Sequence, residues 1–164
     1  MNEGFELSDV VQVPAGDYTT RERGIMASTG RKRPLPLSLM AADQHYYHGT
    51  IQTVETAINL APSAHLALQT SYTNSRVRLP GGAFDSHVGS LRVVWAFSSR
   101  LSAQALIQYN SMDHRIIANA RLHFIHHPGS DFFQVLNEER GSPASTWSFA
   151  RRDAVMKLTY LFRL

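Results

Sequence analysis

Apolar and polar residues alternate along most of this chain with a period of two, as they do in β-strands whose faces meet different surroundings. The segment LSAQALIQYN (101–110) places Leu, Ala, Ala, Ile and Tyr on one face and mainly Ser, Gln and Asn on the other. Segments 50–60, 65–76, 85–97 and 114–126 repeat this pattern. Helical periodicity is scarce, so the sequence predicts an all-β chain.

The length of the alternating segments distinguishes between kinds of sheet. Several segments extend over roughly 10–13 residues, whereas strands of globular proteins are commonest at about 5–6 residues. A tilted strand that crosses a bilayer needs about 9–11 residues. The sequence predicts about ten strands, at 5–13, 17–28, 34–43, 50–60, 65–76, 85–97, 101–111, 114–126, 131–139 and 152–164.

The connections between these strands alternate in predicted length. A short turn rich in Pro, Gly or Ser is usually followed by a longer loop after the next strand. The link at 111–113 is the exception, because it is short where a longer loop would be expected. Short turns at one end of a sheet and longer loops at the other are typical of outer-membrane barrels. The predicted short turns are 61–64, 98–100 and 127–130, and the predicted loops are 43–49, 76–85 and 140–151.

The alternation also assigns side chains to the two faces of such a barrel. We expect the apolar face of the last strand to contact lipid, with Met156, Leu158, Tyr160, Phe162 and Leu164. On the same register we expect seven charged residues to face the interior: Glu55, Arg92, Arg115, Arg121, Asp153, Lys157 and Arg163.

Composition agrees with one β-sheet domain that covers residues 1–164. Of the 164 residues, 43% are hydrophobic and 18% are charged, and no run approaches the 18 apolar residues of a membrane-spanning helix. The net charge of +3 is small and dispersed, so nucleic acid is not expected as a partner. The first residues have no basic segment followed by an apolar one, as a signal peptide would have. Either the chain is part of a longer protein, of which we expect it to be the C-terminal portion, or the protein stays in the cytoplasm.

Candidate catalytic and metal-binding groups are weak. His123, His126 and His127 are close in sequence, but His123 and His126 would point to opposite faces of a strand, so no metal site is predicted. Glu138, Asp113 and Asp131 offer no recognisable pair of facing carboxyl groups. Neither a nucleophile motif around Ser142 and Ser145 nor a phosphate-binding glycine loop is present. The sequence predicts no enzyme, no catalytic residue and no cofactor.

Six short motifs occur in the order and at the spacing of a bacterial protein family. They are PAGDY (14–18), KRPLPLSL (32–39), LPGGAF (79–84), IQYN (107–110), HPGSDFFQVLNE (127–138) and KLTYLFRL (157–164). Through them the chain resembles the C-terminal outer-membrane barrel of a family known only as a domain of unknown function. Its members carry an N-terminal module similar to family 9 carbohydrate-binding domains. Family members usually have an aromatic residue and an arginine where this chain has Leu164 and His127.

Two hypotheses follow for the function. The first is a transmembrane antiparallel β-barrel, or the C-terminal part of one, in the outer membrane of a Gram-negative bacterium, with a pore or transport role. Its expected partners are the lipid bilayer, the barrel assembly machinery, and missing N-terminal strands with the carbohydrate-binding-like module that the resemblance implies. The second is a soluble β-barrel or sandwich that binds an apolar ligand or a protein partner, with its apolar face inside.

Overall fold

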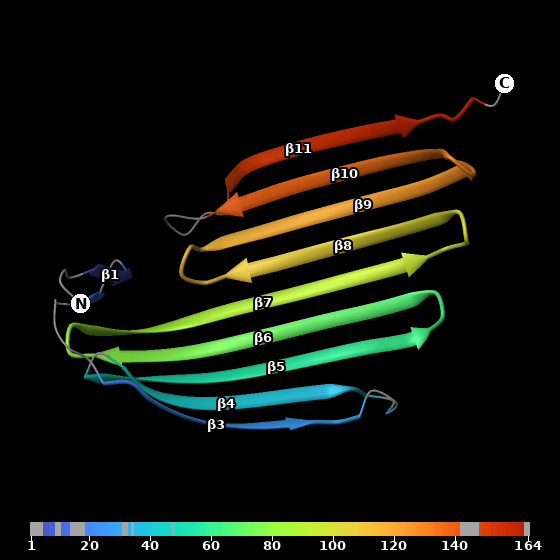
Figure 1. Ribbon diagram of the computed structural model, residues 1–164. Helices are drawn as coiled ribbons and strands as arrows, with labels where there is room; N and C mark the ends of the chain where they lie inside the picture. The colour runs from blue at the N-terminus through green and yellow to red at the C-terminus, as the bar shows by residue number, and fades with distance from the viewer. Residues whose placement is uncertain are drawn as a thin grey trace. The chain divides into compact units, whose positions relative to one another are not determined.

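Every regular element in the described part of the chain is a β-strand. The computed structural model describes residues 5–8, 11–13, 19–30, 33, 35–46, 48–141 and 148–162 (Figure 1). The strands are β1 (Phe5–Ser8), β2 (Val11–Val13), β3 (Arg21–Ser28), β4 (Leu37–Tyr46), β5 (Gly49–Ser63), β6 (Leu66–Leu79), β7 (Gly82–Ala96), β8 (Leu101–Asn110), β9 (Arg115–His127), β10 (Ser130–Gly141) and β11 (Ser148–Thr159).

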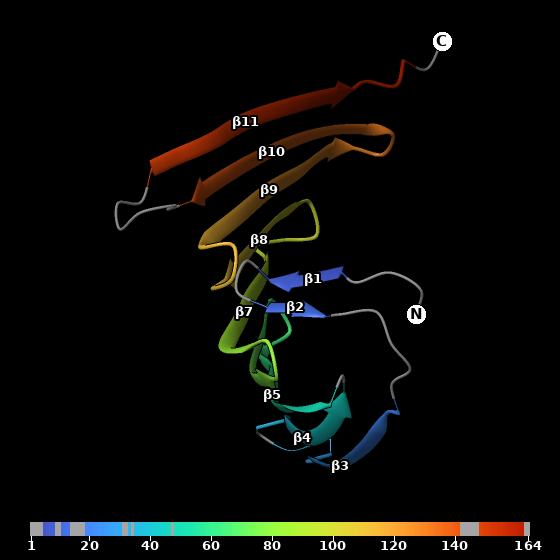
Figure 2. The ribbon, with the colours of Figure 1, turned by 90° about the vertical axis from the view of Figure 1, so that its left-hand side faces the viewer.

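Nine of the strands form one antiparallel sheet in which sequence neighbours are hydrogen-bonded neighbours. The order runs from β3 to β11 without a crossover, so β3 and β11 are the two edges. The prediction of an all-β, antiparallel up-and-down meander is therefore confirmed. Residues 5–13 are not one long strand, because β1 and β2 pair with each other in a separate two-stranded sheet (Figures 1 and 2).

Two of the predicted long loops are strand residues in the structure. Only Pro80 and Gly81 separate β6 from β7, and only residues 47–48 separate β4 from β5. A Pro-Gly pair is a sufficient turn, so the residues on either side of it continue the alternating pattern as strand. The predicted contrast between short turns and long loops was therefore wrong for 43–49 and 76–85. The third loop reduces to residues 142–147, which lie outside the described residues.

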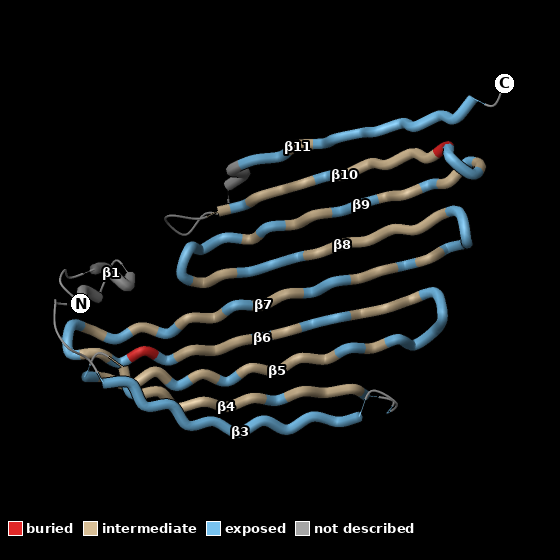
Figure 3. The backbone as a smooth tube through the Cα atoms, in the orientation of Figure 1, coloured by how far each residue is buried: buried red, intermediate tan, exposed pale blue. Residues whose placement is uncertain are grey.

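The chain divides into two compact units. The first comprises Met1–Ala57 and Tyr72–Val88, and the second comprises Ile58–Ser71 and Gly89–Leu164. Among the described side chains only Val77, in the first unit, and Ser130, in the second, are buried, with exposed fractions of 5% and 2%. Most of the described backbone is intermediate or exposed (Figure 3). Neither unit therefore contains a conventional hydrophobic core among its described residues.

In the first unit, the edge strand β3 pairs with β4 in an unbroken register from Arg21 opposite His45 to Ser28 opposite Ser38. Every residue of β3 is exposed, including Ile25 and Met26. The end of this pair is fixed by Thr29, whose Oγ1 accepts the backbone N–H of Leu37 at 2.8 Å. Strand β3 thus presents an uncovered edge with apolar side chains.

In the second unit, the end of the last strand is held by the turn between β9 and β10. Ser130 Oγ accepts the backbone N–H of Leu161 at 3.0 Å, so that N–H does not continue the strand ladder. Strand β11 ends at Thr159 rather than at Leu164 as predicted. The turn has Pro128 and then Gly129 with φ +84°, which are the residues of a type II turn.

Gly129 is the position at which this arrangement is most sensitive to substitution. We expect Gly129→Ala to lower the free energy of unfolding by about 1–2 kcal/mol, because an L-residue is strained at this positive φ. Its Cβ would also lie 2.6 Å from Leu161 Cδ2. Gly89→Ala is the matched control, since no atom lies within 4 Å of its added Cβ. Urea unfolding followed by circular dichroism would measure both, and equal effects would contradict the assigned turn.

Candidate functional site

The registers of β8, β9, β10 and β11 place alternate residues on two opposite faces. In the middle of these strands Leu122 lies between Ala103 and Gln134, and the next residue back, Arg121, lies between Gln104 and Val135. The ladder from β8 to β10 has one irregularity, at Ser130/Asp131, and the ladder from β10 to β11 has one, at Glu139/Arg140. The two faces therefore stay separate through the middle of all four strands.

One face is dominated by apolar side chains and is called the apolar face below. Several of its large side chains are exposed, among them Ile107, Phe124, Leu136, Met156 and Leu158. Its residues are Leu101, Ala103, Ala105, Ile107, Tyr109, Ile116, Ala118, Ala120, Leu122, Phe124, Phe132, Gln134, Leu136, Glu138, Arg140, Arg152, Ala154, Met156 and Leu158.

The opposite face, called the polar face below, carries most of the charged and amide side chains of these strands. Its residues are Ser102, Gln104, Leu106, Gln108, Asn110, Arg115, Ile117, Asn119, Arg121, His123, Asp131, Phe133, Val135, Asn137, Glu139, Arg151, Asp153, Val155, Lys157 and Thr159. Two networks and one stacked group organise this face.

A row of hydrogen bonds crosses three strands of the polar face. The Asn119 side-chain amide donates to Asn137 Oδ1, and Asn137 Nδ2 donates to Asp153 Oδ2 at 2.7 Å. Arg151 Nε lies 3.2 Å from Asp153 Oδ1 and ends the row. One residue pair further along, Arg115 Nε lies 3.0 Å from Glu139 Oε1. The two side-chain hydrogen bonds that join Asn119, Asn137 and Asp153 are part-buried, and these three polar groups satisfy one another.

Beside this row, aromatic and basic side chains stack on the same face. The His123 ring lies parallel to the Phe133 ring, with centroids 4.0 Å apart, and the Arg121 guanidinium carbon lies 4.9 Å from the centroid of Phe133. His123 Nε2 is buried without a hydrogen-bond partner and lies 3.9 Å from Asp131 Oδ2. The position of Arg121 over the Phe133 ring is that of a cation–π interaction, in which a planar guanidinium stacks well on an aromatic face.

The structure places the predicted site residues as follows. Arg115, Arg121, Asp153 and Lys157 share the polar face, whereas Met156 and Leu158 lie on the apolar face. Arg92 alternates with the groove residue Val93 on β7, and Glu55 lies half-buried on β5. Tyr160 and Phe162 follow the end of β11, and Arg163 and Leu164 lie outside the described residues.

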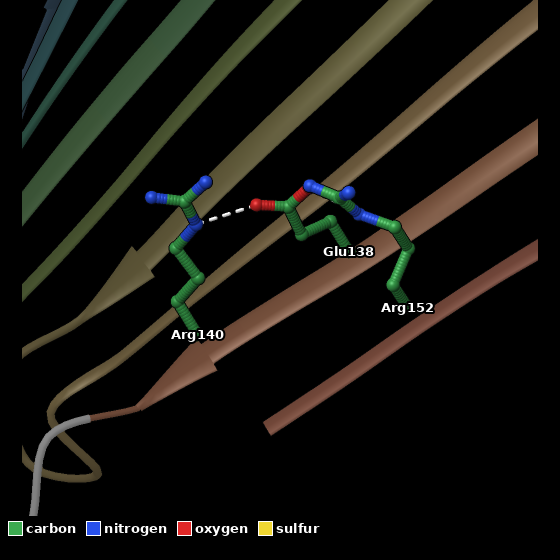
Figure 4. Close-up of polar contacts among 3 residues, drawn as sticks. All are labelled: Glu138, Arg140 and Arg152. Carbon is green, nitrogen blue, oxygen red and sulfur yellow. Dashed lines mark hydrogen bonds and ion pairs between the residues drawn. The ribbon is translucent and has the colours of Figure 1, made fainter. Parts of the chain in front are cut away.

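A charged cluster on the apolar face was not evident from the sequence pattern. Glu138 lies between Arg140 and Arg152 (Figure 4). Its Oε1 accepts Arg140 Nε at 2.5 Å, and its Oε2 accepts Arg152 Nε at 3.0 Å and Nη2 at 2.5 Å. Glu138 and Arg140 are two and four residues beyond Leu136, so the period of two already put them on the face of Leu136. The register of β11 was needed to bring Arg152 opposite Glu138.

Aromatic rings gather near the other end of the same strands, around the turn at 128–129. The ring of Tyr160 lies 5.2 Å from that of His127 and 4.6 Å from that of Phe162. The His126 ring lies 6.4 Å from Phe124 and 4.7 Å from His127. The apolar face is therefore bordered by aromatic rings at one end and by the charged cluster at the other.

A shallow groove of about 370 Å³ is lined mainly by residues of the apolar face, and Gln104 and Arg121 of the polar face also contribute to its lining. The small side chains of Ala103, Ala105 and Ala120 form its floor, and larger side chains, including Trp95, Phe97, Leu122 and Leu136, surround it. The rings of Trp95 and Phe97 are stacked, with centroids 4.9 Å apart. The groove exists because three alanines lie next to one another on neighbouring strands of this face.

Other kinds of site find no support in the described part of the chain. No three histidine or acidic side chains lie close enough there to hold a metal ion. His114, at the turn before β9, adopts φ +46°, and His126 and His127 pack with aromatic rings instead. Within the same residues no helix is long and apolar enough to span a bilayer.

Comparison with known protein families, curated proteins and solved structures finds no match to this chain.

The amide row on the polar face gives a direct test of its contribution to stability. We expect Asn137→Ala to lower the free energy of unfolding by roughly 1–3 kcal/mol, because it removes both hydrogen bonds and leaves their partners unsatisfied. Gln108→Ala, an exposed amide on the same face, is the control and should change stability by less than about 0.5 kcal/mol. Chemical unfolding monitored by circular dichroism measures both. Similar values for the two variants would show that the row is not formed.

Proposed function

We propose that β3–β11 form part of the wall of a transmembrane β-barrel in a bacterial outer membrane. In this proposal the apolar face contacts lipid and the polar face lines the interior. One observation carries it: in β8–β11 most of the exposed large apolar side chains lie on one face, while the amide row and most of the charged side chains lie on the other. A soluble barrel requires the reverse arrangement, with the apolar face enclosed.

The energetics of the two faces support this orientation. Leaving a large apolar side chain in water rather than burying it costs about 1.5–3 kcal/mol, and Met156 and Leu158 are 65% and 75% exposed. A hydrocarbon environment removes this cost without a protein core. The polar face, with Arg115, Arg121 and Lys157, would be unfavourable in lipid and is suited to a water-filled or side-chain-filled interior.

Strand length and the ends of the apolar face agree with the dimensions of a bilayer. Strands β4 to β11 are 10–15 residues long, and a tilted membrane strand needs about 9–11. The aromatic rings of Phe124, His127 and Tyr160 at one end, and Tyr109 near the charged cluster at the other, match the aromatic belts of the two interfaces. The charged cluster then lies in the interfacial region rather than among the acyl chains.

The two open edges determine what else such a barrel requires. Every backbone polar group within the hydrocarbon region must be paired, so β3 and β11 must pair with each other or with further strands. We propose the bilayer and the barrel assembly machinery as partners, and a role as a pore or transport channel.

The family resemblance suggests two further partners, namely additional N-terminal strands and a carbohydrate-binding-like module. The alternative remains a soluble β protein that encloses the apolar face around an apolar ligand or a protein partner.

Partitioning distinguishes these two functions. We expect the protein to sediment or float with phospholipid vesicles and to require detergent for dispersion, because its exposed apolar face would otherwise aggregate. Circular dichroism should show strand content only in detergent or lipid. A protein that stays monomeric and folded in detergent-free buffer would contradict the membrane proposal and favour the soluble alternative.

Two adjacent residues of β11 test which face contacts lipid. Met156 and Val155 are both apolar and are 65% and 57% exposed, but they lie on opposite faces. We expect Met156→Asp to destabilise the assembled protein by on the order of 2 kcal/mol, since it puts a charge in lipid. Val155→Asp should be far milder, because it points toward the polar face. The measure is the fraction of protein in membranes that resists urea extraction, and equal losses would mean that the faces are assigned wrongly.

A further inference from the structure

The groove and the charged cluster lie next to each other on the same face. Leu136, at the edge of the groove, and Glu138 are successive residues of the apolar face, about 7 Å apart along β10. Along β10 the groove is thus followed on the same face by Glu138, which pairs with Arg140 and Arg152. A molecule that fits both parts must have an apolar chain and an ionic group at a fixed distance from it.

The charge of the cluster determines the sign of that ionic group. The two guanidinium groups and the one carboxylate carry a formal net charge of +1, and Arg140 and Arg152 are half exposed at 45% and 55%. The carboxylate holds the two guanidinium groups on either side of itself (Figure 4). Their side chains are thereby positioned before any ligand arrives, which reduces the entropy lost on binding. Guanidinium groups match the oxygens of phosphate in charge and geometry.

From this juxtaposition we infer that the groove and the cluster together bind an anionic phospholipid. Its acyl chain lies over Ala103, Ala105 and Ala120, beside Trp95, and its phosphate contacts Arg140 and Arg152. The inference rests on the proposed function, because it requires the apolar face to contact lipid. Basic residues near a membrane surface each favour anionic lipid by about 1 kcal/mol.

The position of Trp95 in the groove makes occupancy measurable. Bromine atoms on an acyl chain quench tryptophan fluorescence on contact, and Trp147→Phe leaves Trp95 as the sole tryptophan. The protein is reconstituted in bilayers that mix brominated phosphatidylglycerol with unlabelled phosphatidylcholine. A second set of bilayers mixes brominated phosphatidylcholine with unlabelled phosphatidylglycerol. The dependence of quenching on lipid composition gives the relative affinity of the two lipids for the groove.

We expect phosphatidylglycerol to be preferred about fivefold, which corresponds to one net basic charge near the surface. The triple variant Glu138→Gln/Arg140→Gln/Arg152→Gln should abolish the preference, because it removes both guanidinium groups. The paired variant Arg115→Gln/Arg151→Gln removes two arginines from the polar face and should leave the preference unchanged. The preference should also fall as salt is added.

The outcomes separate the inference from the proposed function. Quenching by both brominated lipids without a preference, or a preference that survives in the triple variant, would overturn the lipid site while the membrane orientation stands. Absence of quenching by either lipid would mean that Trp95 does not contact acyl chains, and it would overturn both. Loss of the preference in the polar-face variant would assign the selectivity to overall charge and would also overturn the site.

Discussion

The backbone hydrogen-bond ladder between successive strands is the constraint on which the other features of this protein depend. Side chains in a strand alternate with a period of two, so a slip of one residue would exchange the faces completely. The pairs Leu122–Gln134 and Arg121–Val135 keep their register across the middle of β9 and β10. The irregularities lie near strand ends, at Ser130/Asp131 and at Glu139/Arg140. The separation of an apolar from a polar face follows directly from this regularity.

The regular register matters for stability because very few side chains of the sheet are buried. In a soluble sheet the apolar face would be covered by a second layer of structure, but among the described residues only Val77 and Ser130 are buried. Stability within the sheet then relies on the ladders and on cross-strand pairs, of which the row from Asn119 to Asp153 is an example. In the proposed membrane setting, the bilayer would cover the apolar face without further protein.

The charged cluster has a definite place in this arrangement. Two arginines on a lipid-facing surface would be very unfavourable at the centre of a bilayer, but Glu138 and Arg140 are within four residues of the end of β10 at Gly141. In the proposed orientation the ion pairs would lie in the interfacial region, among water and headgroups. The same position brings them next to the alanine-floored groove, so that one face combines an apolar surface with a cationic border.

The sequence by itself determined the class of fold and the alternation of side chains along β9 and β11. Because alternation with a period of two is a local property, residues such as Arg115, Arg121, Met156 and Leu158 could be assigned to opposite faces before any contact was known. The sequence pattern did not predict the turns correctly. Pro80 and Gly81 alone connect β6 to β7, and the remaining residues of the expected loop are strand. Only the tertiary structure decided which residues meet across strands. The stacking of His123 on Phe133, the pairing of Arg152 with Glu138, and the bond from Ser130 to Leu161 that ends β11 all join residues 10 or more positions apart. Such contacts depend on register, which no local pattern specifies.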